Sequence, residues 1–290
     1  MKPSPDPEEE GEGLGHSKFN IHCFLNGGMS TFLPTLVAFP VYKTVFRQQI
    51  NNQPFPEAVG ELFREGPRKL YRGVGPPLLM QTLKGTLLFG LQEAILHQLS
   101  LSSQSVISTS ALPALAGFGA GLVEAVVFTP FERVQNVLQD GRNYRDLPTL
   151  KSVLVRLRAQ RLTLGYYRAF LPIAARNALG CSIYFGLKGP VSAAVAGEWC
   201  HPMASSFISG ALTSLASSLS IYPLSVLVAN MQAQPVGEVK GVMASWRMLW
   251  MSREQSVALL YRGGSLVIFR SCITWGITTA LYDRQRKLSG

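Results

Sequence analysis

Charge is scarce in this sequence of 290 residues. Charged residues make up 15% of the chain and hydrophobic residues 47%, whereas soluble domains carry about 25% charged residues. Residues 21–42 and 199–237 contain no charged side chain at all. Apolar stretches of about 20 residues are long enough to cross a bilayer. The shortage of charge therefore argues against an ordinary soluble domain and leaves a large soluble helical protein as the alternative.

Motifs for catalysis and metal binding are missing as well. The four cysteines are scattered, without a Cys-x-x-Cys pair or a histidine at ligand spacing, and suit small apolar packing residues. The chain has no nucleophile elbow, no phosphate-binding loop before a lysine, and no paired acids at a spacing that fits acid–base catalysis. We therefore predict that the protein is not an enzyme and uses no metal or cofactor.

Acidic residues gather at the start of the chain, although the net charge is +10. Residues 1–17 hold one lysine against five acids, which gives this tail a charge of −4 and the rest of the chain +14. The tail is predicted to be disordered, and it resembles neither a secretory signal nor an arginine-rich transit peptide. The basic remainder suits a membrane surface or anionic substrates. Nucleic acid is not predicted as a partner, because the chain has no basic-aromatic module.

Two landmarks recur with one period. Pro40, Pro130 and Pro223 lie 90 and 93 residues apart, and each opens a decapeptide that ends in glutamine. A Tyr-Arg pair follows each decapeptide, with spacings of 96 and 94 residues, and begins at Tyr71, Tyr167 and Tyr261. Two unrelated landmarks that share a period and an order predict a threefold repeat. Each repeat contains two apolar segments, so the prediction is six membrane spans.

The predicted fold is an all-α membrane protein with six transmembrane helices in three pseudo-threefold repeats of about 95 residues. The tail (1–17) precedes a single domain (18–290), whose repeats are 18–105, 106–198 and 199–290. Helices are expected because the segments lack the alternation of barrel strands, the other fold that satisfies its backbone in lipid. Each proline should kink its helix, and three kinks would draw helix ends together below a central cavity.

Several short motifs resemble the mitochondrial carrier family (solute carrier family 25). They are the proline decapeptides and the run from Glu65-Gly66 to Tyr71-Arg72-Gly73, and the likeness covers nearly the whole chain after the tail. The pairs Arg176-Asn177 and Arg270-Ser271 are most similar to the branch that includes the mitochondrial NAD carrier. The resemblance implies a multi-pass protein of the inner mitochondrial membrane with short matrix-side helices. It also implies alternating access, a small anionic substrate, a monomer, and cardiolipin in the surrounding bilayer.

The resemblance further implies a matrix gate, which this chain has altered. The family places an acid two residues after each proline, where Tyr42, Glu132 and Ser225 stand here. It places a base five residues after, where this chain has Val45, Gln135 and Val228. No acid–base pair is complete, so we expect a weak gate in which Glu132 faces position 228. The predicted gate residues are Pro40, Pro130, Pro223, Tyr42, Gln49, Gln139 and Gln232.

A cytoplasmic gate is implied at the ends of the even-numbered spans. Residues 282–286 keep the family pattern of an aromatic residue, an acid and a base three residues later. The second span keeps only the acid, with Leu96 where the base should be. The predicted residues of this gate are Glu93, Tyr282, Asp283 and Arg286.

Charges inside apolar spans identify the predicted substrate site, because a charge in a membrane helix costs about 2.5–3.5 kcal/mol unless it meets water or a partner. Arg176 and Arg270 stand at the same offset of nine residues from their repeat's landmark tyrosine. The first repeat has Met80 and Gln81 there, which suit packing, and Lys84 one turn later. The predicted contacts are Arg176, Asn177, Arg270, Ser271, Lys84, Gln81, Met80, Glu124 and Glu132.

Two guanidiniums and an ammonium in a cavity suit a phosphate-bearing anion. Glu124 either faces a cationic ring of the solute together with Glu132, or simply neutralises Lys84 or Arg176. We predict transport of a nucleotide-type anion, with NAD as the first candidate. The alternatives are another phosphate-bearing cofactor or nucleotide, and a non-transporting protein that keeps the fold for binding or assembly.

Overall fold

A computed structural model describes residues 21–102, 111–161, 165–195, 202–233 and 241–269. Every regular element in these ranges is a helix, as the sequence predicts. The first two repeats follow one plan, in which a long helix, short peripheral helices and a second long helix follow one another, and the described part of the third repeat follows the same order. The order of the elements therefore has the same period as the two sequence landmarks.

The helices are assigned to the repeats as follows. The first repeat contains α1 (Ile21–Asn51), α2 (Phe55–Arg64), α3 (Pro67–Leu70) and α4 (Gly75–Ser102). The second contains α5 (Leu112–Gln139), the 3-10 helix η1 (Gly141–Asn143), α6 (Leu150–Arg158) and α7 (Phe170–Val195). The third contains α8 (Pro202–Ser220), α9 (Tyr222–Ala233), α10 (Val242–Ser252) and α11 (Val257–Leu260). Helical residues 264–269 follow α11 and end the described part of the chain.

The long helices have the length that a bilayer requires. Among the described residues, α5 and α7 are apolar and long enough to span it on their own. Helices α8 and α9 qualify together as one span, broken by a bend of 61° next to Pro223. The helices α1 and α4 contain 31 and 28 residues, and about 20 residues suffice at 1.5 Å per residue. The other two landmark prolines lie inside α1 and α5, which continue past them.

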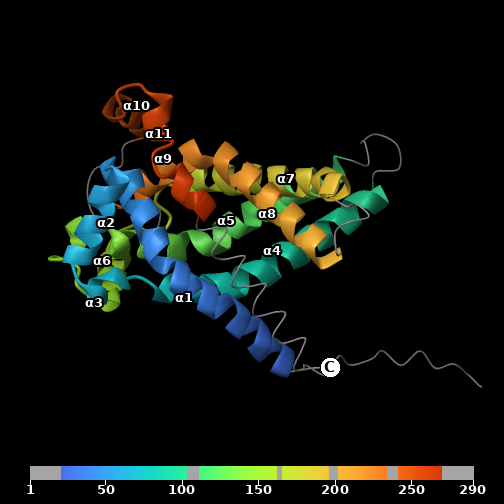
Figure 1. Cartoon of the computed structure of the whole chain (residues 1–290), viewed down its shortest axis with the longest axis horizontal. Helices are drawn as coiled ribbons and strands as arrows, with labels where there is room; N and C mark the ends of the chain where they lie inside the picture. Colours follow the sequence, from blue (N-terminus) through green and yellow to red (C-terminus); the bar gives the residue numbers. More distant parts are fainter. Residues whose placement is uncertain (1–20, 103–110, 162–164, 196–201, 234–240, 270–290) are drawn as a thin grey trace, which may run out of the picture.

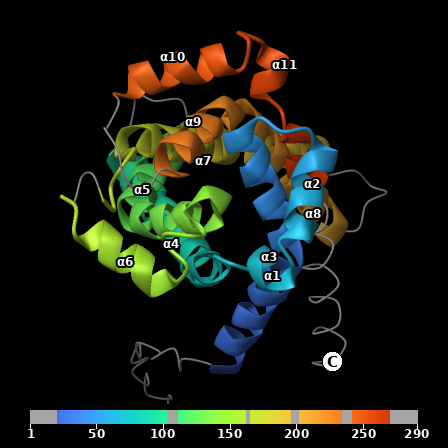
Figure 2. The same cartoon turned by 90° about the vertical axis from the view of Figure 1, so that its left-hand side faces the viewer.

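The short helices gather at one end of the bundle. In Figure 1 the long helices run along the molecule, while α2, α3 and α6 lie at the left-hand end with α10 and α11 above them. Figure 2 looks onto that end and shows α2, α6 and α10 around the periphery of the bundle, one from each repeat. This arrangement is the threefold distribution that the repeats predict.

The proline and Tyr-Arg landmarks recur together because they are partners in space. Pro130 has no N–H, so the carbonyl of Val126 one turn earlier loses its helical donor. The hydroxyl of Tyr167, the landmark tyrosine of the same repeat, donates to that carbonyl at 3.0 Å. The second landmark therefore satisfies the backbone group that the first one leaves unpaired.

In the other two repeats the landmark tyrosine stacks on the residue before the proline. The ring centroids of Tyr71 and Phe39 are 6.0 Å apart, and those of Tyr261 and Tyr222 are 5.6 Å apart. The residue two positions after each landmark tyrosine has positive φ: Gly73 at 88°, Ala169 at 64° and Gly263 at 96°. All three repeats thus make the same left-handed turn, although only two have a glycine there.

Small residues of α5 let this helix approach α7 closely. A Cβ atom added to Gly117 would lie 2.7 Å from the carbonyl oxygen of Cys181. A Cβ atom added to Gly121 would lie only 2.5 Å from the carbonyl oxygen of Asn177. The close approach sets the position of Arg176 relative to α5.

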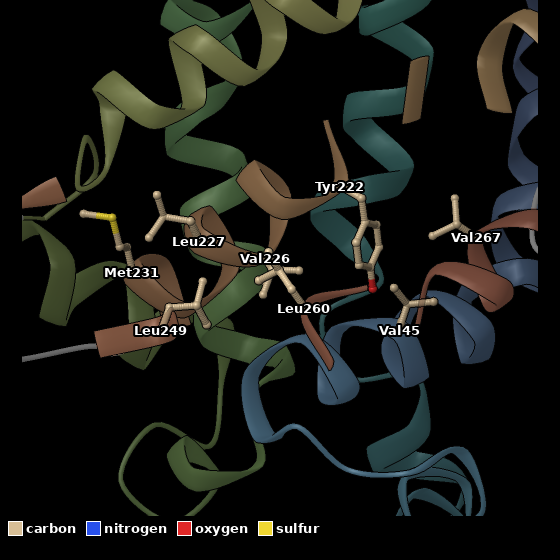
Figure 3. Packing of buried hydrophobic residues seen from close by; sticks show 8 residues of the cluster. All are labelled: Val45, Tyr222, Val226, Leu227, Met231, Leu249, Leu260 and Val267. Atoms are coloured by element: carbon tan, nitrogen blue, oxygen red, sulfur yellow. The ribbon is translucent and has the colours of Figure 1, made fainter. Parts of the chain in front are cut away.

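A buried apolar cluster joins the first and third repeats near the end that carries the short helices. In Figure 3, Tyr222 and Val226 of α9 lie, together with Leu260 of α11, between Val45 of α1 and Leu249 of α10. The cluster consists of Val45, Tyr222, Val226, Leu227, Met231, Leu249, Leu260 and Val267. The proline end of α9 is therefore packed against α1.

Candidate functional site

The guanidinium of Arg176 on α7 is held by two residues. Its two terminal nitrogens donate to the two carboxylate oxygens of Glu132 on α5 at 2.6 and 2.7 Å. Its Nε and Nη2 also donate to Oδ1 of Asn177 at 3.0 and 2.9 Å. Side chains of the ion pair are only 15% and 17% exposed, so solvent screens the pair weakly.

A second ion pair lies further along α5. The Lys84 ammonium on α4 is 2.6 Å from Oε1 of Glu124, whose side chain is almost fully buried. The other carboxylate oxygen of Glu124 accepts from the Cys181 thiol of α7 at 3.5 Å. Of the two roles open to Glu124 in the sequence, the structure favours neutralisation of Lys84. The two ion pairs connect three neighbouring helices, α4, α5 and α7.

All three repeats border a cavity of about 220 Å³ beside the Arg176–Glu132 pair. The second repeat contributes Glu132, Arg176, Gln135, Asn136 and Gln139. The first and third repeats contribute Tyr42, Val45, Phe46, Gln49, Ser218, Ile221, Tyr222, Ser225, Ala229 and Val267. The structure therefore brings together the three residues at the family's acid positions and two of the three decapeptide glutamines.

The expectation that Glu132 faces position 228 stays a prediction, but the structure gives Glu132 another partner. Val228 is 1% exposed and packs in an apolar cluster with Ala125, Ile173 and Ala174, while Glu132 is bound to Arg176. The acid of the proline decapeptide thus pairs within its own repeat, with a predicted substrate residue. Desolvation explains this choice, because a buried carboxylate needs a cationic partner and valine offers none.

The third decapeptide glutamine, Gln232, lies behind the cavity lining and is fully buried. Its Oε1 accepts from Nδ2 of Asn136 at 2.6 Å, and its Nε2 donates to the carbonyl of Arg168 at 3.4 Å. Gln232 therefore connects the third repeat to the second, as a brace between neighbouring repeats would.

Other predicted residues take no part in these two ion pairs. Met80 is half-buried, and Gln81 and Glu93 are exposed on α4. Five predicted residues lie outside the described part of the chain and stay predictions: Arg270, Ser271, Tyr282, Asp283 and Arg286.

A model of the family described as "Mitochondrial carrier protein" matches residues 108–196 and 201–289. The chain belongs to the mitochondrial carrier family. It is 43% identical over 283 residues to "Solute carrier family 25 member 53" of Homo sapiens, covering 95% of this chain and 91% of that protein. It is 34% identical over 276 residues to "Mitochondrial nicotinamide adenine dinucleotide transporter SLC25A51" of Mus musculus, with 93% and 89% covered. The human SLC25A52 protein, named with the same description, is 32% identical over 262 residues, with 90% and 87% covered.

Membership confirms several predictions. The carrier is a multi-pass protein of the inner mitochondrial membrane, with six transmembrane helices in three repeats, and its relatives are transporters rather than enzymes. The end of the bundle with α2, α6 and α10 is accordingly its matrix end.

The carrier also contains buried polar residues that sequence reasoning missed. Arg133 on α5 and Arg253 after α10 are 0% and 1% exposed, and both contact the neighbouring repeat. Arg133 could have been singled out in the sequence, because it is a charged residue within an apolar helix. The contacts of Arg253 have no signal in the sequence, because their acceptors are mostly backbone carbonyls.

A basic cluster at the matrix end surrounds Tyr144 of the second repeat. The Arg72 guanidinium lies 4.2 Å from the ring centroid, and Arg47 donates to the tyrosine hydroxyl at 3.2 Å. Lys43 and Lys69 lie 5.1 and 5.8 Å from the same centroid. Burial raises the pKa of Tyr144 to about 12, so the ring remains neutral and presents its electron-rich face to the cations.

Proposed function

We propose that this carrier moves a nucleotide-type anion across the inner mitochondrial membrane, with NAD as the first candidate. The proposal rests on the position of Arg176, whose guanidinium lies at the wall of the cavity and is bound by two carboxylate oxygens. A phosphate offers the same pair of acceptor oxygens as a carboxylate. The relatives at 34% and 32% identity are named as mitochondrial nicotinamide adenine dinucleotide transporters, which supports the choice of NAD.

Binding is an exchange of partners in this proposal. A phosphate of the solute takes the place of Glu132 on Arg176, while Asn177 keeps the guanidinium oriented through its Oδ1. Glu132 is then left as a carboxylate without its partner in a poorly solvated place, which is unfavourable. A solute that also carries a positive charge compensates the released carboxylate.

NAD satisfies both requirements, because it combines a pyrophosphate with a cationic nicotinamide ring. The ring would lie near Glu132 and the pyrophosphate near Arg176, while Lys84 and Glu124 remain paired. A nucleotide without a cation satisfies only the first requirement. This difference separates NAD from the second candidate, another phosphate-bearing cofactor or nucleotide.

Reconstituted carrier tests the proposal. We expect proteoliposomes to take up NAD, and NAD to raise the unfolding temperature of the purified protein, since a ligand that binds only the folded state stabilises it. Arg176→Gln should abolish both effects, whereas Arg247→Gln, at an exposed arginine of α10, should change neither. Neither uptake nor stabilisation by any nucleotide would instead favour the non-transporting alternative.

We also propose that the carrier works as a monomer whose matrix-end grooves hold lipid chains. One groove of about 390 Å³ lies beside Pro40 and is lined by α1, α2 and the start of the last span. Another of about 380 Å³ lies beside Pro130, between α4, α5 and α6. Both are lined almost entirely by apolar side chains, which suits acyl chains such as those of cardiolipin. Native mass spectrometry of the purified carrier would detect retained lipid and report the oligomeric state.

A further inference from the structure

Backbone carbonyls at the C-terminal end of α1 accept hydrogen bonds from side chains of the third repeat. The last carbonyls of a helix have no partner within the helix and need donors from elsewhere. Arg253 donates to the carbonyls of Gln48, at 3.2 Å, and Gln49, and to the side chain of Asn52. Arg262 donates to the carbonyl of Asn52 at 2.5 Å.

The last described turn of α9 is bound in the same way by the second repeat. Arg133 of α5 donates to the carbonyl of Gln232 and, through Nε, to the carbonyl of Gly165 at 3.1 Å. Asn143 of η1 donates to the carbonyl of Ala233 at 3.0 Å. An arginine and an asparagine of one repeat thus hold a kinked-helix end of the next.

The interface between the first and second repeats also contains an arginine donor. Arg72 donates to the carbonyl of Leu147 and lies against the ring of Tyr144. The arginines therefore donate between the repeats in a cyclic direction: from the first repeat to the second, from the second to the third, and from the third to the first.

We propose that this ring of donors is an inter-repeat latch that holds the matrix ends of the three repeats together. Its buried members are Arg133, Asn143 and Arg253, and it takes over the task that the missing acid–base pairs perform elsewhere in the family. The carbonyls at a helix C-terminus carry the negative end of the helix dipole, and bonds from a guanidinium to them are charge-assisted. Separation of the helix ends would leave buried guanidiniums without these acceptors, so the latch opposes opening toward the matrix.

Solvent access from the matrix side tests the latch. Ser225 borders the cavity, so a Ser225→Cys variant in oriented proteoliposomes reports access by its rate of labelling with a membrane-impermeant maleimide. Mass spectrometry of the peptide containing position 225 separates this reaction from labelling of the native cysteines. Adding the reagent on one face at a time distinguishes matrix opening from general loosening.

We expect Arg253→Gln to raise the rate from the matrix face by at least about tenfold, the factor that corresponds to the loss of one charge-assisted hydrogen bond. The rate from the opposite face should stay the same or fall. Arg253→Lys keeps the charge but loses the forked geometry, and should give a smaller rise. Arg247→Gln on the exposed side of α10 is the matched control and should have no effect.

A variant with a smaller change tests the latch even if Arg253→Gln does not fold. Nδ2 of Asn230 donates to the carbonyl of Gln49 at 2.9 Å, so Asn230→Ala removes a single bond at the same helix end and should raise the matrix-side rate less. Unchanged matrix-side rates in folded Arg253→Gln and Asn230→Ala proteins would overturn the latch, as would equal rises from both faces. Neither result depends on which solute the carrier moves.

Discussion

Glu132→Gln tests whether a phosphate displaces Glu132 from Arg176. The substitution keeps the size of the side chain and removes the charge that competes with the solute. A hydrogen bond to a charged group contributes about 1.5–3 kcal/mol, and the pair is mostly buried, with 15% and 17% exposure. We therefore expect the affinity for a nucleotide without a cationic group, such as ADP, to rise by about tenfold to a hundredfold.

The same substitution should affect NAD less, because the variant loses the carboxylate that compensates the nicotinamide ring. Without ligand, the variant should be less stable by about 1–3 kcal/mol, since Arg176 loses its counter-charge. Calorimetric titration of ADP and NAD into wild-type and variant carrier measures both affinities, and thermal unfolding measures the stability. Glu93→Gln, at an exposed acid of α4, is the matched control. An unchanged or weaker ADP affinity in Glu132→Gln would refute the exchange of partners.

Three further variants test the packing, the backbone and the charges. Gly121→Ala should lower stability by about 1–3 kcal/mol through overpacking, because its Cβ would lie 2.5 Å from the Asn177 oxygen, whereas Gly60→Ala meets open space and should not. Ala169→Gly should raise the unfolding temperature, because an alanine at φ 64° is strained by about 1–2 kcal/mol. Tyr144→Phe should reduce the loss of folding stability at alkaline pH. The raised pKa of Tyr144, about 12, stabilises the fold below pH ~10, and that contribution is lost as the pH rises through ~12.

The fold followed from the sequence because its signals are local and repeated. Apolar length, the spacing of the three prolines and the Tyr-Arg pairs together predicted the helices and their threefold order. The sequence predicted a kink at each proline, but not that Tyr167 donates to the carbonyl that Pro130 leaves unpaired. That relation needs the fold, because 41 residues separate the two partners.

Pairing within the site was harder to predict for the same reason. In the sequence, Arg176 is one of several charges inside apolar spans, and Glu124 is the acid proposed there as its partner. The structure pairs Arg176 with Glu132, 44 residues away, so the removal of either partner now leaves a charge uncompensated. The contacts of Arg253 were unpredictable, because backbone carbonyls are present at every position and carry no sequence signal.

Recognition of the solute and closure of the matrix end depend on different residues in this carrier, and this separation can be tested. Glu132 holds a cavity arginine, whereas Arg253 holds the end of α1 through Gln48, Gln49 and Asn52. In a carrier whose gate uses the decapeptide acids, one carboxylate change would disturb both properties together. Here we expect the stability losses of Glu132→Gln and Arg253→Gln in the unliganded protein to add within about 0.5 kcal/mol in the double variant. Alternating access requires that substrate binding be coupled to opening. The stability losses of the two variants should therefore deviate from additivity only when a nucleotide is bound. A coupling above that limit without ligand, measured by the same thermal cycle, would mean that the ion pair and the latch form one network.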